Sequence, residues 1–146
     1  MTNAVSLAQQ ASTGVSPSFR NRIINGNMVI SQRNGTTAVN NSNNTYCLDR
    51  WVMETGLDNK FSAGQYTNAP TGFSNSLGIS SNSAYSVPAG EYYGVAQKIE
   101  GFNTADLGWG TASAKTVTLS FWVYSSLTGT FAGSILNSAL NRSYVF

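Results

Sequence analysis

The chain has 146 residues, which suits one domain with a single core and leaves no room for a second independent one. Its eight basic and six acidic side chains are scattered singly, so we expect no nucleic-acid partner, because that binding rests on clustered Lys and Arg. Histidine is absent and Cys47 is the only cysteine, which removes the usual general base, the commonest zinc ligand and any internal disulfide. We therefore expect no enzyme, no metal centre and no cofactor, although backbone carbonyls could hold a structural calcium ion.

Residues 1–19 are rich in Gln, Ser, Ala and Thr, with isolated apolar side chains and a proline near the end. This composition predicts an extended or short helical N-terminal arm that is ordered only against a partner. The sequence shows neither the block pattern of a signal peptide nor the roughly 20 apolar residues that a membrane span requires. We expect synthesis in a cytoplasm, without secretion or membrane insertion.

From residue 20 onwards, alternating apolar residues and Asn- or Gly-rich turns predict about eight short strands. Helix is disfavoured by the same composition. The predicted strands cover residues 22–33, 45–55, 60–67, 76–81, 92–100, 116–124, 130–136 and 142–146. This number of strands favours an all-β fold, an antiparallel β-sandwich or jelly roll over residues 20–146.

Two of these strands carry most of the predicted core. In residues 22–33 the more apolar face is formed by Ile24, Gly26, Met28 and Ile30. Residues 116–124 show the clearest alternation, with Val, Leu, Phe and Val on one face, and are expected to form a central strand. Both faces of residues 45–55 are apolar, and Cys47 is interpreted as a small buried hydrophobe. The last predicted strand stops abruptly, so either the sandwich is truncated or a neighbouring chain completes the sheet.

Aromatic residues are the main functional signal. Flat rings with a polar edge stack on sugars while Asp, Asn and Gln bind the hydroxyls. The candidate glycan-binding residues are Trp109, Tyr85, Tyr92, Tyr93 and Asp106. The alternative is that these rings fill the core or an interface, an interpretation favoured for Trp51 and Trp122, which lie inside predicted strands. The six carboxylates show no pairing typical of a glycosidase and are expected to be solvated or salt-bridged.

Six motifs resemble a domain found in tail-fibre and tail proteins of bacteriophages. They are RNRIINGNMVISQRN at residues 20–34, LDRW at 48–51, APTGF at 69–73, QKIEGF at 97–102, DLGWG at 106–110 and LSFWV at 119–123. The pattern is similar in turn to jelly-roll carbohydrate-binding modules. The resemblance implies a β-sandwich, a location in the virion tail and a homotrimer. In that family the domain continues beyond the position that matches Phe146.

The resemblance also implies separate roles for the arm and the sandwich. The arm would dock on another tail protein through Val5, Leu7, Val15 and Phe19. The sandwich would contact host surface polysaccharide or pack into an oligomeric shaft. We therefore expect a tail-fibre or fibre-attachment protein that recognises the host surface. A free carbohydrate-binding module is the alternative, and a fragment of a polysaccharide depolymerase is a third possibility.

Overall fold

The structure is a computed structural model that describes residues 20–146. The predicted arm over residues 1–19, including its proposed docking residues Val5, Leu7, Val15 and Phe19, lies outside the described residues. The chain divides into two compact units, of which the first ends at Thr116 and the second runs from Val117 to Phe146. Each unit is described by itself.

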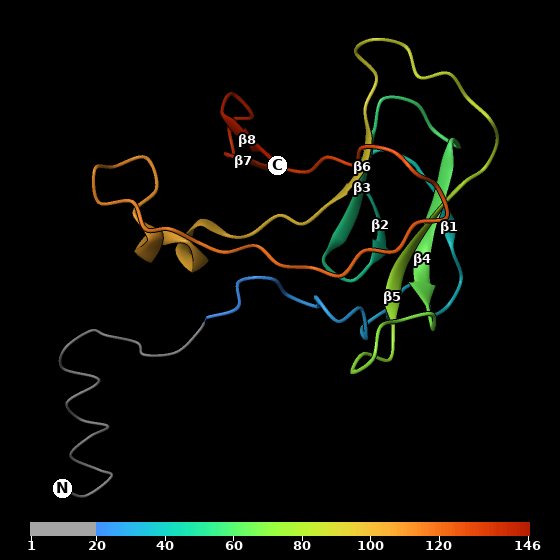
Figure 1. The fold of residues 1–146 in the computed structure, drawn as a ribbon, viewed down its shortest axis with the longest axis horizontal. Helices are drawn as coiled ribbons and strands as arrows, with labels where there is room; N and C mark the ends of the chain where they lie inside the picture. Colours follow the sequence, from blue (N-terminus) through green and yellow to red (C-terminus); the bar gives the residue numbers. More distant parts are fainter. Residues whose placement is uncertain (1–19) are drawn as a thin grey trace, which may run out of the picture. The chain divides into compact units, whose positions relative to one another are not determined.

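The first unit contains two three-stranded antiparallel sheets (Figure 1). One sheet has the order β1-β4-β5 and the other the order β2-β3-β6. The bounds are β1 (Val39–Asn40), β2 (Thr45–Leu48), β3 (Trp51–Thr55), β4 (Phe61–Tyr66), β5 (Ser76–Ser81) and β6 (Tyr93–Ala96). The β4–β5 ladder is continuous from Phe61 opposite Ser81 to Tyr66 opposite Ser76. Strands β4 and β5 confirm the predictions over residues 60–67 and 76–81, and β6 is shorter than predicted.

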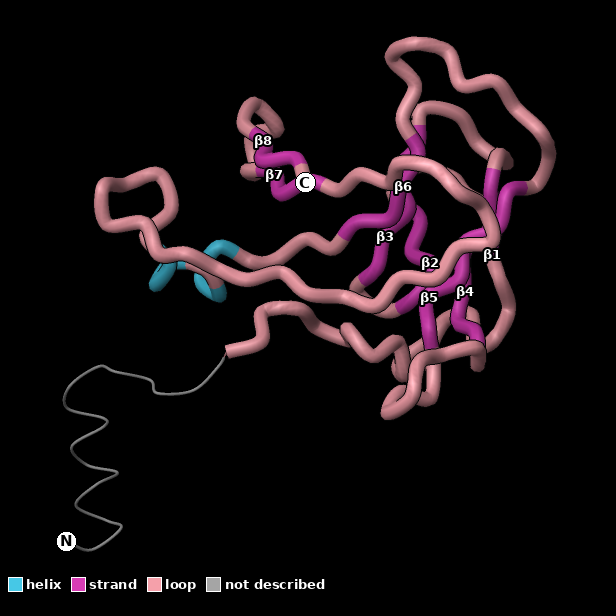
Figure 2. Tube along the Cα trace, viewed as in Figure 1, coloured by secondary structure: helices cyan, strands magenta, loops and turns pink. Residues whose placement is uncertain are grey.

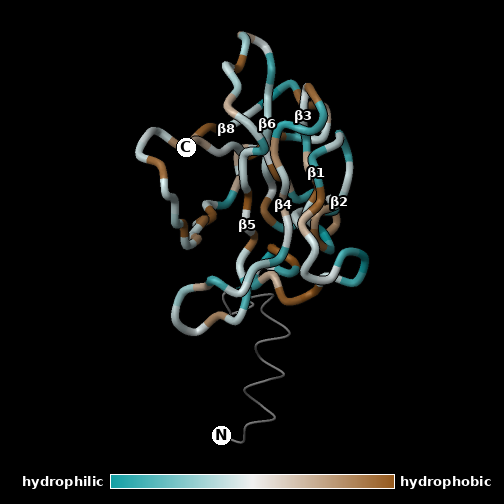
Figure 3. The backbone as a smooth tube through the Cα atoms, turned by 90° about the vertical axis from the view of Figure 1, so that its right-hand side faces the viewer, coloured by the Kyte–Doolittle hydropathy of each residue, from teal (hydrophilic) through white to brown (hydrophobic). Residues whose placement is uncertain are grey.

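A small apolar core is shared by the two sheets. Cys47 and Met53 come from β2 and β3, Phe61 and Ala63 come from β4, and all four are buried. The prediction that Cys47 is a buried hydrophobe is confirmed, and burial raises the pKa of its thiol. In Figure 3, brown hydrophobic stretches occur along the strands of the two sheets and also in some of the loops. The core therefore joins sheets that have no backbone hydrogen bonds in common.

Residues 45–55, predicted as one strand, form a hairpin of β2 and β3. The chain reverses at Asp49 and Arg50, and Arg50 has a left-handed backbone with φ 74°. Arg50 is held in this turn by two hydrogen bonds that its guanidinium donates to Glu100, at 2.7 and 3.0 Å. The apolar residues that occupy both faces of the single predicted strand are therefore divided between two strands, β2 and β3.

The prediction of a strand over residues 22–33, with Ile24, Gly26, Met28 and Ile30 facing the core, is wrong. Ile24 and Ile30 are exposed, and the buried residue is Asn25, from the opposite face. Asn25 and Met28 have positive φ values of 54° and 57°, which a strand does not allow. The amide of Asn25 donates to the carbonyls of Ile30 and Asp49, at 2.8 and 2.9 Å. The turn-forming Asn-Gly-Asn sequence therefore overrides the apolar alternation.

The second unit contains one hairpin, formed by β7 (Ser134–Leu136) and β8 (Ser143–Val145). The strand predicted over residues 116–124 is not formed, and Trp122, expected to fill the core or an interface, is 76% exposed. Alternation makes a segment suitable for a sheet, but a strand forms only where another strand supplies the hydrogen bonds. The phenyl rings of Phe121 and Phe146 contact each other within this unit, with centroids 6.3 Å apart.

The described residues are therefore nearly all-β, with antiparallel sheets. The helical content there is two short 3-10 turns, η1 (Gly101–Asn103) and η2 (Ala105–Leu107) (Figure 2). Across residues 20–146 there is no helix with the length and apolar character needed to cross a membrane.

Candidate glycan-binding site

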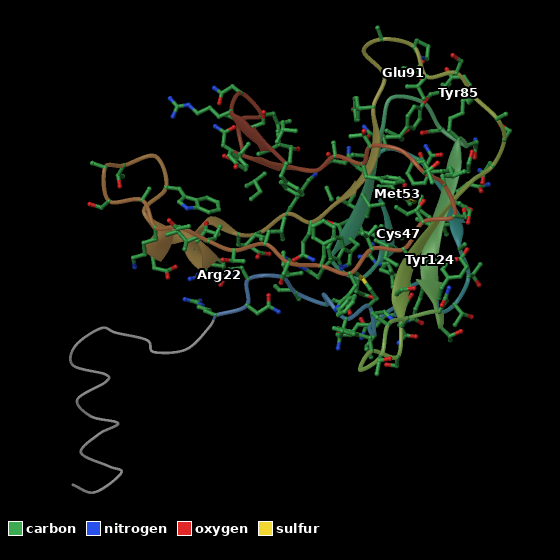
Figure 4. The ribbon with its side chains drawn as sticks, in the orientation of Figure 1. Arg22, Cys47, Met53, Tyr85, Glu91 and Tyr124 are labelled. Atoms are coloured by element: carbon green, nitrogen blue, oxygen red, sulfur yellow. The ribbon has the colours of Figure 1, made fainter. Side chains whose placement is uncertain are left out.

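Two tyrosines share one carboxylate in the first unit. Tyr93, at the start of β6, donates to Glu91 Oε2 at 2.5 Å, and Tyr85 donates to both carboxylate oxygens at 3.1 Å. The Nζ of Lys60 lies 3.7 Å from the centroid of the Tyr85 ring. Figure 4 shows Tyr85 and Glu91 side by side at the loop between β5 and β6. We call these four residues the tyrosine–glutamate cluster.

The cluster is anchored on the core through Tyr93. Its ring meets the buried Phe61 ring edge-on, with centroids 6.4 Å apart, and meets the Tyr85 ring in the same way at 6.3 Å. Tyr93 lies opposite Thr55 of β3, so its backbone position is set by the sheet. The loop residue Tyr85 thereby packs against a residue whose position is set by the sheet. Edge-to-face pairs of this kind add about 0.5–1.5 kcal/mol each beyond the area that they bury.

The electrostatics keep both hydroxyls protonated near neutral pH. Burial raises the pKa of Tyr93 and of Tyr85, and the hydrogen bond to the Glu91 carboxylate raises each further. Both tyrosines therefore act as donors to Glu91. The cluster combines aromatic faces, an acceptor carboxylate and a cation, which together can bind a polar ligand with apolar C–H faces.

The structure divides the five predicted glycan residues into two groups. Tyr85 and Tyr93 belong to the cluster, and Tyr92, 56% exposed, lies between Glu91 and Tyr93 in sequence. Asp106 belongs to a different part of the unit, where Arg22 donates to both of its oxygens at 2.8 and 2.6 Å. Figure 4 shows Arg22 at the end of this unit opposite to Tyr85.

Trp109 lies in the loop that follows η2, three residues after Asp106. Its indole N–H donates to the carbonyl of Lys115 at 3.0 Å, and its ring is 46% exposed. The indole edge is thus already occupied by the backbone, while part of the ring surface faces solvent. Trp109 and Asp106 accordingly lie outside the tyrosine–glutamate cluster.

Sequence reasoning nominated the tyrosines but missed their partners. Glu91 was noted only as one carboxylate among six, and Lys60 was not singled out. The spacing of Tyr85, Glu91 and Tyr93 along a short loop is a local signal that could have suggested the cluster. Lys60 precedes β4 and reaches Tyr85 only through the tertiary fold, so the sequence holds no local signal for it.

Two ion pairs fix the segment that contains η1 and η2. Arg50 pairs with Glu100 at 2.7 Å, and Arg22 pairs with Asp106 at 2.6 Å. The hydrogen bonds from the two arginines lower the pKa of Glu100 to about 2 and the pKa of Asp106 to about 2. Both carboxylates are thus ionised in the folded chain at pH values where they would be protonated in the unfolded chain.

These shifts predict a loss of stability in acid. Because Glu100 has a lower pKa when folded, its contribution is present above its ordinary value of 4.5 and is lost as the pH falls through about 2. We expect Glu100→Gln to melt at a lower temperature at pH 7 and to depend less on pH over this window. Thermal melting of both proteins, followed by circular dichroism from pH 7 down to about pH 2, measures both effects. Wild-type and Glu100→Gln melting curves that shift in parallel with pH would contradict the assignment.

Among residues 20–146 no group of three or more Cys, Asp or Glu side chains is placed to hold a metal ion. Comparison with protein-family models, curated proteins and solved structures found no match for the chain.

Proposed function

We propose that this chain is a structural component of a bacteriophage tail that recognises glycans of the host surface through the tyrosine–glutamate cluster. The observation that carries the proposal is the pair of ordered, partly exposed tyrosine rings that share Glu91 beside Lys60. Sugars present axial C–H patches that stack on such rings, and hydroxyls that bind carboxylates and ammonium groups. The ordering of Tyr85 in the free protein reduces the entropy lost on binding.

The tail assignment is supported by the six motifs that resemble phage tail proteins, and by the antiparallel all-β architecture. Within that architecture we propose a jelly-roll sandwich of the carbohydrate-binding-module type. We propose that the chain is located in the virion and that the arm, residues 1–19, docks it on another tail protein.

The proposed homotrimer has a structural argument. Trp122, Tyr124 and Leu140 of the second unit are 76, 85 and 75% exposed. Large exposed apolar side chains of this kind are suited to contacts between copies of the chain. We propose that copies of the chain cover these side chains in one another. Light scattering of the full chain at micromolar concentration tests this: a trimer is expected, and a stable monomer would contradict it.

The glycan role is tested with an array of bacterial surface polysaccharides and the full chain. We expect binding to one class of glycan, a loss of at least roughly tenfold in affinity for Tyr85→Ala, and little change for Tyr66→Ala. Tyr66 is a matched control, because its exposed fraction of 39% is close to the 38% of Tyr85. Equal binding by wild type and Tyr85→Ala would exclude the cluster as the site.

Mass spectrometry of purified particles tests the tail role separately. The proposal predicts a fixed copy number of this chain in each particle. Glycan binding by a protein that is absent from particles would favour a free carbohydrate-binding module. Release of reducing sugar from the bound glycan would favour a depolymerase.

A further inference from the structure

A depression of about 230 Å³ lies on the β2–β3 hairpin, apart from the tyrosine–glutamate cluster. Its lining residues are Arg33, Tyr46, Asp49 and Arg50. Sites for drug-sized ligands measure roughly 300–1,000 Å³, so this depression suits a ligand group of about one sugar ring. Two of its four lining residues are arginines, in a chain with few charges.

Arg33 supplies a positive charge that is not neutralised by the rest of the described chain. It forms no ion pair within residues 20–146, where the ion pairs involve Arg20, Arg22, Arg50 and Lys98. Its guanidinium carbon lies 5.3 Å from the centroid of the Tyr46 ring, so the ring orients the planar group. An oriented guanidinium that keeps its N–H edge available is suited to bidentate recognition of a carboxylate.

Arg50 forms a rigid wall of the depression. Its guanidinium donates to the carboxylate of Glu100 and, at 2.9 Å, to the carbonyl of Lys98. Its Nε is buried and has no hydrogen-bond partner in residues 20–146. Because the Nε is buried and both terminal nitrogens are already bonded, Arg50 shapes the depression, and Arg33 is the guanidinium that faces a ligand.

Asp49 adds an acceptor to this cationic depression. Its Oδ2 accepts a hydrogen bond from the backbone N–H of Gln32 at 2.6 Å, and its carbonyl accepts one from the Asn25 amide at 2.9 Å. These bonds hold the turn region of residues 25–32 against the hairpin. A carboxylate at this position can accept hydrogen bonds from sugar hydroxyls, and it disfavours a dianion such as phosphate.

We propose that this depression binds a carboxylate-bearing sugar, a uronic acid residue of an acidic polysaccharide. Arg33 pairs with the sugar carboxylate, Asp49 accepts from the hydroxyls and Tyr46 provides an apolar surface, while Arg50 forms part of the rigid wall. This inference rests on the proposed glycan recognition and adds a second subsite with a defined ligand class. It gives the chain two contacts with different chemistry, one aromatic and one charge-based.

The test is a titration of the 15N-labelled full chain with glucuronate, glucose and inorganic phosphate, followed by amide chemical shifts. We expect saturable shifts at residues around the depression with glucuronate, and weaker ones with glucose and phosphate. Arg33→Gln should weaken glucuronate binding by roughly tenfold or more, because a charge-assisted bidentate pair is lost. The spectrum of each variant shows directly whether it is folded.

Two control variants separate this inference from the proposed function. Arg142→Gln makes the same charge change in the second unit, and Tyr85→Ala alters the cluster, so neither should affect glucuronate binding. Equal glucuronate affinity in wild type and Arg33→Gln would overturn the site, and so would phosphate binding as tight as glucuronate. Tyr85→Ala could bind the polysaccharide array as wild type does while glucuronate binding still depends on Arg33. In that case the tyrosine–glutamate cluster is excluded as a glycan site, and the site at the depression stands.

Discussion

Replacing Asn41 with alanine is expected to lower the free energy of unfolding by about 2–4 kcal/mol. Asn41 is fully buried, and its side chain uses all of its hydrogen-bonding capacity. The amide donates to Thr55 Oγ1 at 2.9 Å and to the Leu57 carbonyl at 2.8 Å. The side-chain oxygen accepts from the backbone N–H groups of Lys60 and Phe61, at 2.6 and 2.7 Å. Alanine would remove the acceptor of the Lys60 and Phe61 N–H groups, whereas Thr55 Oγ1 and the Leu57 carbonyl would keep their hydrogen bond to each other, at 2.6 Å.

The position of Asn41 makes this effect larger than that of an ordinary polar residue. Its hydrogen bonds join the end of β3 to the start of β4, and these two strands belong to different sheets. Urea denaturation of wild type and Asn41→Ala measures the difference. Asn68→Ala is the matched control, because Asn68 is exposed and contributes its backbone carbonyl to Ser76. A difference of less than about 1 kcal/mol would show that water replaces the lost partners.

Changing Glu91 to glutamine is expected to reduce glycan affinity by roughly tenfold to a hundredfold. The neutral amide is a weaker acceptor for Tyr85 and Tyr93, and its NH2 group faces one of the hydroxyls that Glu91 now binds. The Tyr85 ring, on which Lys60 lies, would lose its fixed orientation. This change acts on the groups that are proposed to hold the sugar.

Calorimetry with the glycan identified on the array measures this loss. The control is Glu54→Gln, which removes a carboxylate that pairs with Lys98 at 3.4 Å outside the cluster. We expect the control to bind as wild type does. Glu91→Gln and Glu54→Gln with the same affinity would mean that the shared carboxylate does not organise the site.

The strands that could be predicted are those in which apolar alternation coincides with pairing to a strand nearby in the sequence. Residues 60–67 and 76–81 alternate and are separated by the turn cluster around Pro70 and Gly72, so β4 and β5 were located closely. The hairpin at Asp49 and Arg50 was missed, because a single turn-forming Asp inside an apolar run is a weak signal and Arg50 is not a typical turn residue. Arg50 adopts its left-handed backbone with support from Glu100, which is distant in sequence.

The strand predictions for residues 22–33 and 116–124 are wrong for different reasons. In the first segment, Asn25 uses its amide to build a turn with Ile30 and Asp49, a competing set of bonds that apolar alternation does not reveal. In the second segment the alternation is present but no strand of the described chain pairs with it. Periodicity reports which face of a segment could be buried, whereas pairing depends on where the rest of the chain goes.

The contacts of the candidate site that depend on tertiary structure could likewise not be predicted from the sequence. Residue type was sufficient to nominate Tyr85 and Tyr93, because flat aromatic rings with a polar edge are suited to stacking on sugars. It could not show that Asp106 is already held by Arg22 or that Lys60 stacks on Tyr85, since both contacts depend on tertiary structure. The depression lined by Arg33 and Arg50 was likewise invisible, because two segments predicted as strands form its turns.

The most direct test of glycan recognition by the tyrosine–glutamate cluster is an amide chemical-shift titration of the full chain with host surface polysaccharide. We expect saturable amide shifts centred on Lys60, Tyr85, Glu91 and Tyr93. These shifts should be absent in Tyr85→Ala. Polysaccharide that binds the chain without shifting these four residues would contradict recognition by the cluster.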